Sequence, residues 1–204
     1  MIAKYMYKIK NGNQNAILLL HEIYGINQHI KDTANDLARN GYDLYCPNFL
    51  GVTNYFKYSE EEKAYNYFMK EITIESGFEQ AKEILIELNN HYKQIFVIGY
   101  SVGATIAWLC SATKYCTGVI GFYGSRIRDY CFIEPNCPTL LLFAKNEESF
   151  NVEKLQNELE KKPDIKIEIF EGEHGFADRY CRNYNEDLLN RSQKMVKQFL
   201  KQFF

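Results

Sequence analysis

Short apolar runs alternate with longer amphipathic segments along almost all of this chain, and this alternation restricts its fold more than any other feature. The runs NAILLLH, QIFVIG and TGVIGFYG are apolar almost without interruption, as are strands buried on both faces of a parallel sheet. The segments between them repeat apolar residues every three or four positions, which is typical of helices. The order therefore predicts an α/β fold, with a doubly wound, mostly parallel sheet and helices on both faces.

The predicted elements cover most of the chain. We expect strands over residues 3–10, 15–21, 42–47, 94–99, 117–124, 138–144 and 165–172. We expect helices over residues 28–41, 72–92, 102–116, 151–162 and 185–203. Because no change in composition marks a second domain, residues 1–204 are expected to form one domain, in which the aromatic segment 50–70 is a candidate lid.

Composition and charge argue against several classes of function. The 204 residues are 46% hydrophobic and carry a formal charge of -2 without a long block of one sign, so a nucleic-acid partner is not expected. The N-terminus lacks the apolar stretch of a signal peptide, and no run approaches the roughly 18 apolar residues of a membrane span. We expect a cytoplasmic protein without a membrane partner, and the sequence leaves monomer and homodimer open.

The cysteines and histidines do not predict a metal centre. None of the six cysteines belongs to a C-x-x-C pair, and Cys and His never occur at the spacing of metal ligands. We therefore expect no metal and no organic cofactor, and we interpret most cysteines as reduced packing residues. Cys181 is the cysteine that lies near the candidate site described next.

The stretch GYSVG at residues 99–103 suggests a nucleophile. Ser101 lies between a predicted strand and a predicted helix, at the sheet edge where ligands bind in α/β folds. Gly99 and Gly103 leave room for the sharp turn that such a position requires. The N–H of Val102 opens the helix, so it is a candidate donor to a developing oxyanion.

A serine nucleophile requires a base, and the chain contains four histidines. His174 follows the last predicted strand, at the same sheet edge as Ser101, and is the candidate base. His29 and His91 fall within or at the end of predicted helices, so we expect them to be solvated surface or cap residues. His21 follows an early strand and is the weaker candidate.

The acid that orients His174 should follow the strand over residues 138–144. Glu147 and Glu148 come directly after this strand, and we favour Glu147 while keeping Glu148 as the alternative. Asp164 comes too late, at the start of the next strand. The resulting order of serine, acid and histidine is that of the α/β-hydrolase fold.

Four stretches together resemble the dienelactone hydrolase family of α/β-hydrolases. They are HEIYGIN at 21–27, GYSVGA at 99–104, GFYG at 121–124 and GEHGFADR at 172–179. They match the family's His-Glu-x-x-Gly loop, its nucleophile elbow, a Tyr-Gly strand end and its histidine loop. The resemblance spans nearly the whole chain and implies an α/β-hydrolase fold.

The resemblance also implies roles for four further residues. The N–H of Ile23 would be the second oxyanion donor. Glu22 matches a loop glutamate that helps to control the nucleophile, although a structural role in hydrogen bonding is equally open. Tyr123 is an accessory residue at the strand end, and Arg179 is a partial match to arginines that grip a substrate carboxylate.

Two residues depart from the family's pattern. Ser101 stands where the enzymes that give the family its name have cysteine, and Glu147 stands where the family commonly has aspartate. We expect a serine hydrolase of small esters, lactones or similar acyl substrates. An acyltransferase or peptidase with the same three residues stays open. So does a non-catalytic binding module that uses the aromatic side chains of residues 55–68.

Overall fold

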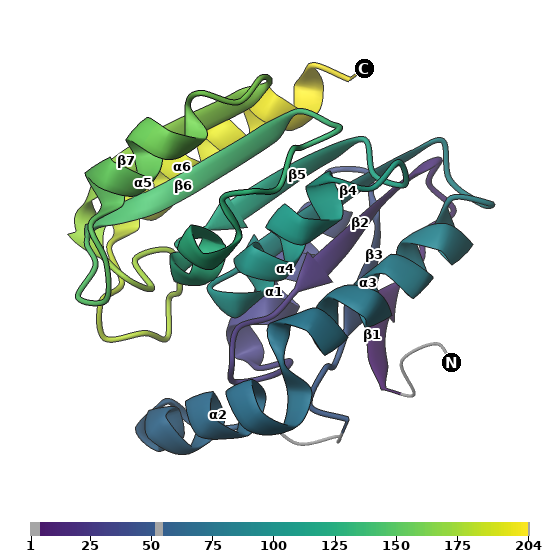
Figure 1. Ribbon diagram of the computed structural model, residues 1–204. Coiled ribbons are helices and arrows are strands. Elements are labelled where there is room, and N and C mark those ends of the chain that lie inside the picture. Colours follow the sequence, from purple (N-terminus) through teal and green to yellow (C-terminus); the bar gives the residue numbers. More distant parts are fainter. Residues whose placement is uncertain (1–4, 52–54, 204) are drawn as a thin grey trace.

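A seven-stranded sheet forms the centre of the computed structural model, which describes residues 5–51 and 55–203 (Figure 1). The strands are β1 (Met6–Ile9), β2 (Asn15–Leu20), β3 (Asp43–Pro47), β4 (Gln94–Tyr100), β5 (Gly118–Phe122), β6 (Thr139–Asn146) and β7 (Ile165–Glu173). They are ordered β1-β3-β2-β4-β5-β6-β7. Strand β1 pairs antiparallel with β3 and all other pairs are parallel, so the predicted mostly parallel sheet is confirmed. Residues 3 and 4 of the first predicted strand lie outside the described residues.

Helices cover both faces of this sheet. They are α1 (Gln28–Ala38), α2 (Glu61–Tyr67), α3 (Ile74–Leu88), α4 (Val102–Ser111), α5 (Val152–Leu159) and α6 (Glu186–Lys201). Helices α1 and α6 share one apolar core with the sheet, and α3, α4 and α5 pack on the opposite face (Figure 1). No described helix has the length and the apolar character that crossing a membrane requires.

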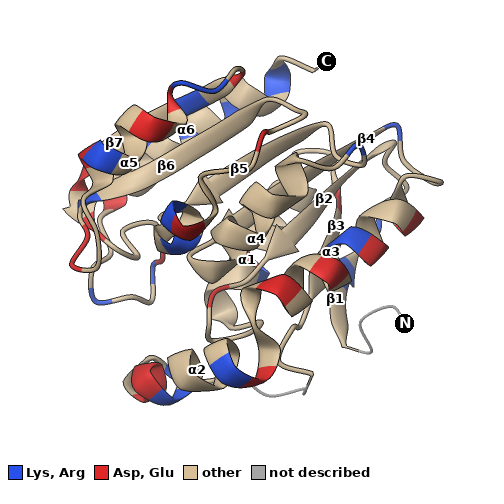
Figure 2. Cartoon of the chain, viewed as in Figure 1, with Lys and Arg blue, Asp and Glu red and all other residues tan. Residues whose placement is uncertain are grey.

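Charge is excluded from the middle of the sheet. Strands β2, β4 and β5 contain no charged residue, because both of their faces are covered by helices. Figure 2 shows Lys, Arg, Asp and Glu mostly on helices and in loops, with both signs interspersed. This distribution buries a continuous apolar layer on each side of the sheet and leaves the strand ends for polar side chains.

All five predicted helices end before the residue that the sequence indicated, and α3 also begins later. The helix predicted over residues 102–116 is α4, which ends at Ser111, because the Thr113 hydroxyl donates to the Cys110 carbonyl at 2.8 Å and the chain turns toward β5. The helix predicted over residues 72–92 is α3, which begins at Ile74. Thr73 has a φ of 63° and separates it from a preceding π-helical turn.

The segment proposed as a lid packs beside the carboxyl end of the sheet, although residues 52–54 lie outside the described part. It contains a 3₁₀ turn (Tyr58–Glu60), helix α2 and a π-helical turn (Phe68–Ile72). Ala64 and Phe68 are fully buried, and the Phe56 N–H donates to the Tyr24 carbonyl at 2.9 Å. These contacts attach the segment to the loop that follows β2.

Candidate active site

Ser101 occupies a strained turn between β4 and α4. Its φ of 53° and ψ of -116° define a backbone conformation that residues other than glycine rarely adopt. The Ser101 N–H donates to the Phe122 carbonyl at 2.9 Å, which fixes the turn against β5. The strain is maintained by its surroundings and holds the hydroxyl at the carboxyl edge of the sheet.

The two glycines of the turn are required by close backbone contacts. A Cβ at Gly99 would lie 2.1 Å from the Gly103 carbonyl oxygen. A Cβ at Gly103 would lie 2.5 Å from the carbonyl oxygens of Leu20 and His21. Because α4 approaches β2 and β4 this closely, only glycine fits at either position, and the GYSVG pattern is explained by packing.

The strain at Ser101 predicts an effect on stability. Ser101→Gly and Ser101→Ala both remove the hydroxyl, but only glycine relieves the positive φ. We expect the glycine variant to be the more stable by about 1 kcal/mol, since relief of about 1–3 kcal/mol of strain outweighs the extra entropy of glycine in the unfolded chain. Thermal unfolding should show a melting temperature about 2–4 °C above that of the alanine variant. Equal melting temperatures would contradict the strain.

Ser101, His174 and Glu147 form a hydrogen-bonded chain. His174 Nε2 lies 3.0 Å from Ser101 Oγ, and His174 Nδ1 lies 2.9 Å and 3.1 Å from the two carboxylate oxygens of Glu147. The carboxylate can only accept at neutral pH, so Nδ1 carries the proton and Nε2 is free to accept from the serine. The three residues come from the ends of β4, β6 and β7, which are brought together by the parallel sheet.

The His174 imidazole is held from several sides. Its backbone carbonyl accepts a hydrogen bond from Asn183 Nδ2 at 2.9 Å, and its ring lies 4.8 Å from the Tyr123 ring. Burial lowers the pKa of His174, but the hydrogen bond and the negative charge of Glu147 outweigh burial and raise the pKa above its ordinary value. Among the described residues, Glu148 makes no such contact and its side chain is exposed.

The two residues predicted to supply oxyanion donors line the cavity beside Ser101. Val102 begins α4, and Ile23 lies in the loop after β2, and both residues line the same cavity as Ser101. Within the described part of the chain, neither N–H donates to a protein acceptor. Both residues therefore lie where the sequence-based prediction requires them, at the cavity that contains Ser101.

The loop after β2 is fixed by a neutral histidine. The Phe49 N–H donates to His21 Nε2 at 3.0 Å, so Nδ1 is the protonated nitrogen and donates to the Glu22 carbonyl at 2.5 Å. Complete burial lowers the pKa of His21 to about 4, so the ring stays uncharged at neutral pH. His21 therefore supports the loop and is not placed to act on Ser101.

Glu22 and Tyr123 lie behind the hydrogen-bonded chain. Burial, followed by the negative charge of Asp178, raises the pKa of Glu22 to about 8. The Tyr123 hydroxyl is fully buried and has no well-formed hydrogen bond within residues 5–51 and 55–203, but it lies close enough to Glu22 to lower that pKa. Both residues were predicted from the sequence, and both lie beside His174 or its loop.

A cavity of about 880 Å³ opens above Ser101. Tyr58 and Tyr65 border it from the segment proposed as a lid, and Cys181 borders it from the histidine loop. Charged side chains of both signs line it, and the acidic ones outnumber the basic ones: Glu22, Glu61, Glu147, Glu148, Glu173 and Asp178 against Arg126, Arg128 and Arg182. This volume suits a small organic substrate.

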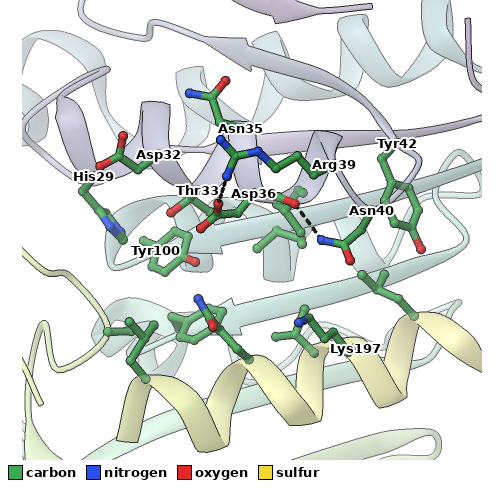
Figure 3. A pocket seen from close by; sticks show the side chains of 18 of the residues that line it. His29, Asp32, Thr33, Asn35, Asp36, Arg39, Asn40, Tyr42, Tyr100 and Lys197 are labelled. Atoms are coloured by element: carbon green, nitrogen blue, oxygen red, sulfur yellow. Dashed lines mark hydrogen bonds and ion pairs between the residues drawn. The ribbon is translucent and has the colours of Figure 1, made fainter. Parts of the chain in front are cut away.

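Arg179, which was predicted to bind a substrate carboxylate, does not line this cavity. It lines a second cavity of about 1000 Å³ between α1 and α6, which Figure 3 shows with Tyr42, Tyr100 and residues of α1 along it. Arg179 is exposed there and lies near Asp32. The arginines beside Ser101 are instead those of the turn after β5 and of the chain after the histidine loop. These arginines could not be predicted from the sequence, because they occur in no recognisable motif.

The prediction that His29 is a solvated surface or cap residue is wrong. His29 is 4% exposed, because the first turn of α1 packs on the sheet and places its ring 4.7 Å from that of Tyr100. Burial lowers the pKa of His29, although Asp178 opposes this effect. His91 is exposed, as predicted.

Comparison with known proteins gives one consistent result. The model of the dienelactone hydrolase family matches residues 2–204. "Uncharacterized protein YczH" of Bacillus subtilis (strain 168) is 38% identical over 183 residues, which are 89% of this chain and 90% of that protein.

Two solved structures share the fold. A protein from Klebsiella pneumoniae is 19% identical, with a TM-score of 0.79 over 96% of this chain and 92% of its own. The "Dienelactone Hydrolase-like Promiscuous Phospotriesterase P91" from metagenomic libraries is 15% identical, with a TM-score of 0.74 over 95% of this chain and 88% of its own. At these identities the two likenesses establish the α/β-hydrolase fold and nothing further.

Proposed function

Because the chain belongs to the dienelactone hydrolase family, we propose that it is a serine hydrolase that cleaves a small ester, lactone or similar acyl substrate. The observation that carries the proposal is the continuous chain of hydrogen bonds from Ser101 through His174 to Glu147. A serine, an imidazole and a carboxylate in this order form the constellation that activates a serine hydroxyl.

The proposed reaction begins at Ser101. The hydroxyl attacks the substrate carbonyl while His174 Nε2 accepts its proton, and Glu147 stabilises the imidazolium that forms. The N–H groups of Val102 and Ile23 bind the oxyanion of the tetrahedral intermediate, an effect worth roughly 3 kcal/mol per donor in known enzymes. His174 then returns the proton to the leaving alcohol, and water releases the acyl group from Ser101 by the same steps.

The nucleophile is the residue in which this chain departs from the enzymes that give the family its name. A cysteine thiol ionises more readily than a serine hydroxyl, so serine depends more strongly on its base. The contact of 3.0 Å between His174 and Ser101 and the two contacts between His174 and Glu147 supply that base in an oriented form. These contacts support an ester hydrolase in which serine replaces cysteine.

The first experiment is labelling with a fluorophosphonate together with a series of p-nitrophenyl esters from acetate to octanoate. We expect the probe to modify Ser101, as located by mass spectrometry, and the ester series to reveal the acyl length that the cavity accepts. Ser101→Ala is the control for both. No labelling and no turnover of any ester would reject the hydrolase and favour a binding module. Faster transfer of the acyl group to an added alcohol than to water would favour an acyltransferase.

The elevated pKa of His174 predicts the pH dependence of the reaction. Only the neutral imidazole can accept the serine proton, so kcat/KM should fall as the pH decreases through the pKa of His174. Because Glu147 raises that pKa, the midpoint should lie above the 6.5 of an ordinary histidine, and Glu147→Gln should move it to lower pH. A pH–rate profile of both proteins tests this. An unchanged midpoint in the variant would show that Glu147 does not raise the pKa of the group that titrates, which would contradict the prediction.

A further inference from the structure

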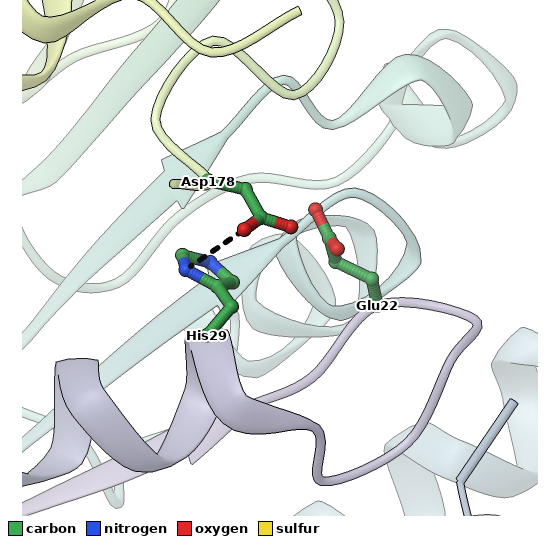
Figure 4. A group of neighbouring side chains, drawn as sticks. All are labelled: Glu22, His29 and Asp178. Carbon is green, nitrogen blue, oxygen red and sulfur yellow. Dashed lines mark ion pairs between the residues drawn. The ribbon is translucent and has the colours of Figure 1, made fainter. Parts of the chain in front are cut away.

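Three buried side chains, two from residues 22–29 and one from the histidine loop, meet beside the cavity. Glu22 comes from the loop after β2, His29 from the first turn of α1 and Asp178 from the histidine loop (Figure 4). One nitrogen or oxygen atom from each lies within 4.8 Å of the other two, and the residues are at most 5% exposed. An imidazole and two carboxyl groups in one small volume form a set of ligands that first-row transition metals accept.

His29 lacks a hydrogen-bonding partner in this position. Its Nε2 is buried and has no partner among the described residues, and its Nδ1 lies 3.7 Å from Asp178 Oδ1, beyond hydrogen-bonding distance. Figure 4 shows the ring directed toward the Asp178 carboxylate. Two atoms bound to the same ion at about 2.1 Å lie about 3–4.2 Å apart, so the separation of 3.7 Å fits two ligands of one ion.

Asp178 is oriented by donors that a ligating carboxylate would need. The Tyr58 hydroxyl donates to Asp178 Oδ2 at 2.5 Å, and the Tyr180 N–H donates to Oδ1 at 2.9 Å. Asn27 Nδ2 in turn donates to the Tyr58 hydroxyl at 2.9 Å. Hydrogen bonds of this kind hold a ligand in place and are typical of the surroundings of metal sites.

No basic side chain balances these carboxyl groups. Within residues 5–51 and 55–203, neither Glu22 nor Asp178 forms an ion pair with Lys or Arg, and the only ionic neighbour of Asp178 is His29. Buried carboxylates are usually paired or coordinate a cation. Because Glu22 and Asp178 also line the cavity above Ser101, an ion has a route to the cluster.

We propose that Glu22, His29 and Asp178 bind one divalent transition-metal ion of the Mn²⁺, Co²⁺ and Zn²⁺ class. The ion would connect α1, the loop after β2 and the histidine loop, and so stabilise the arrangement of the loops around Ser101. The site could not be predicted from the sequence, because Asp178 lies far along the chain from Glu22 and His29 and the three residues show no ligand spacing. The proposal does not depend on hydrolase activity.

Binding of Mn²⁺ to the full chain tests the site. Mn²⁺ is the probe because it binds oxygen and nitrogen in preference to the six thiols. After treatment with a chelator, titration followed by the EPR signal of free Mn²⁺ should give one ion per chain. His29→Gln and Asp178→Asn should each weaken binding by about tenfold or more, and the matched control His91→Gln should leave it unchanged. No binding up to about 1 mM Mn²⁺, or equal binding by all four proteins, would overturn the proposal.

The wild type alone provides a second test if a variant does not fold. The chain has four histidines, so its imidazole resonances can be resolved and assigned by NMR. Mn²⁺ should broaden the resonances of His29 first and leave those of the exposed His91 sharp. Broadening of His91 before His29 would locate the ion at the surface and overturn the proposal.

Discussion

Ser101→Ala is expected to reduce the hydrolysis of a p-nitrophenyl ester by about a million-fold, with a residual rate above that in water from the oxyanion donors and substrate binding. Alanine keeps the Cβ and the backbone, so circular dichroism should match that of the wild type. His174→Ala should cost about as much, because the serine and the histidine act as one unit through their hydrogen bond of 3.0 Å. The double variant should therefore be no slower than either single variant.

The matched control for this experiment is Ser125→Ala. Ser125 lines the same cavity as Ser101, and none of its described contacts involves His174. Ser125→Ala should change the rate of ester hydrolysis by less than about tenfold, since the substitution removes contact area without removing the nucleophile. If Ser101→Ala kept a tenth of the activity while remaining folded, another group would be the nucleophile and the proposed mechanism would be rejected.

The strands could be predicted from the sequence because their burial is uniform. Strands β2, β4 and β5 are covered on both faces, so their apolar runs end where the strands end. The ends of the helices were predicted less well, because tertiary contacts decide them. Every residue of helix α4 is buried, so no polar face in its sequence marks where it ends, and its end is set by the turn toward β5.

The residues of the candidate site that follow parallel strands could be predicted from the sequence. Ser101, His174 and Glu147 each follow a strand, and a parallel sheet brings such positions to one edge. The burial of His29 was not predictable, because a histidine in an amphipathic helix is usually solvated and only the packing of α1 on Tyr100 decides otherwise. The position of Arg179 depended in the same way on the path of the loop.

The sequence left two candidates for the acid, Glu147 and Glu148, and the structure distinguishes them by their contacts and exposure. Both residues follow β6 and have the same side chain, so position alone separates them. The Glu147 side chain is 4% exposed and contacts His174 Nδ1 with both oxygens, whereas the Glu148 side chain is exposed. The two variants therefore form a matched pair that differs only in this contact.

Glu147→Gln is expected to lower kcat by about ten-thousand-fold, while Glu148→Gln changes it by less than about tenfold. The glutamine keeps the shape of the side chain. Its amide can donate to Nδ1, which would place the imidazole proton on Nε2, where it cannot accept from Ser101. Steady-state kinetics of both variants, with unfolding curves to establish that they fold, provide the measurement. Equal losses in the two variants would reject Glu147 as the acid, because only Glu147 is placed to control the tautomer.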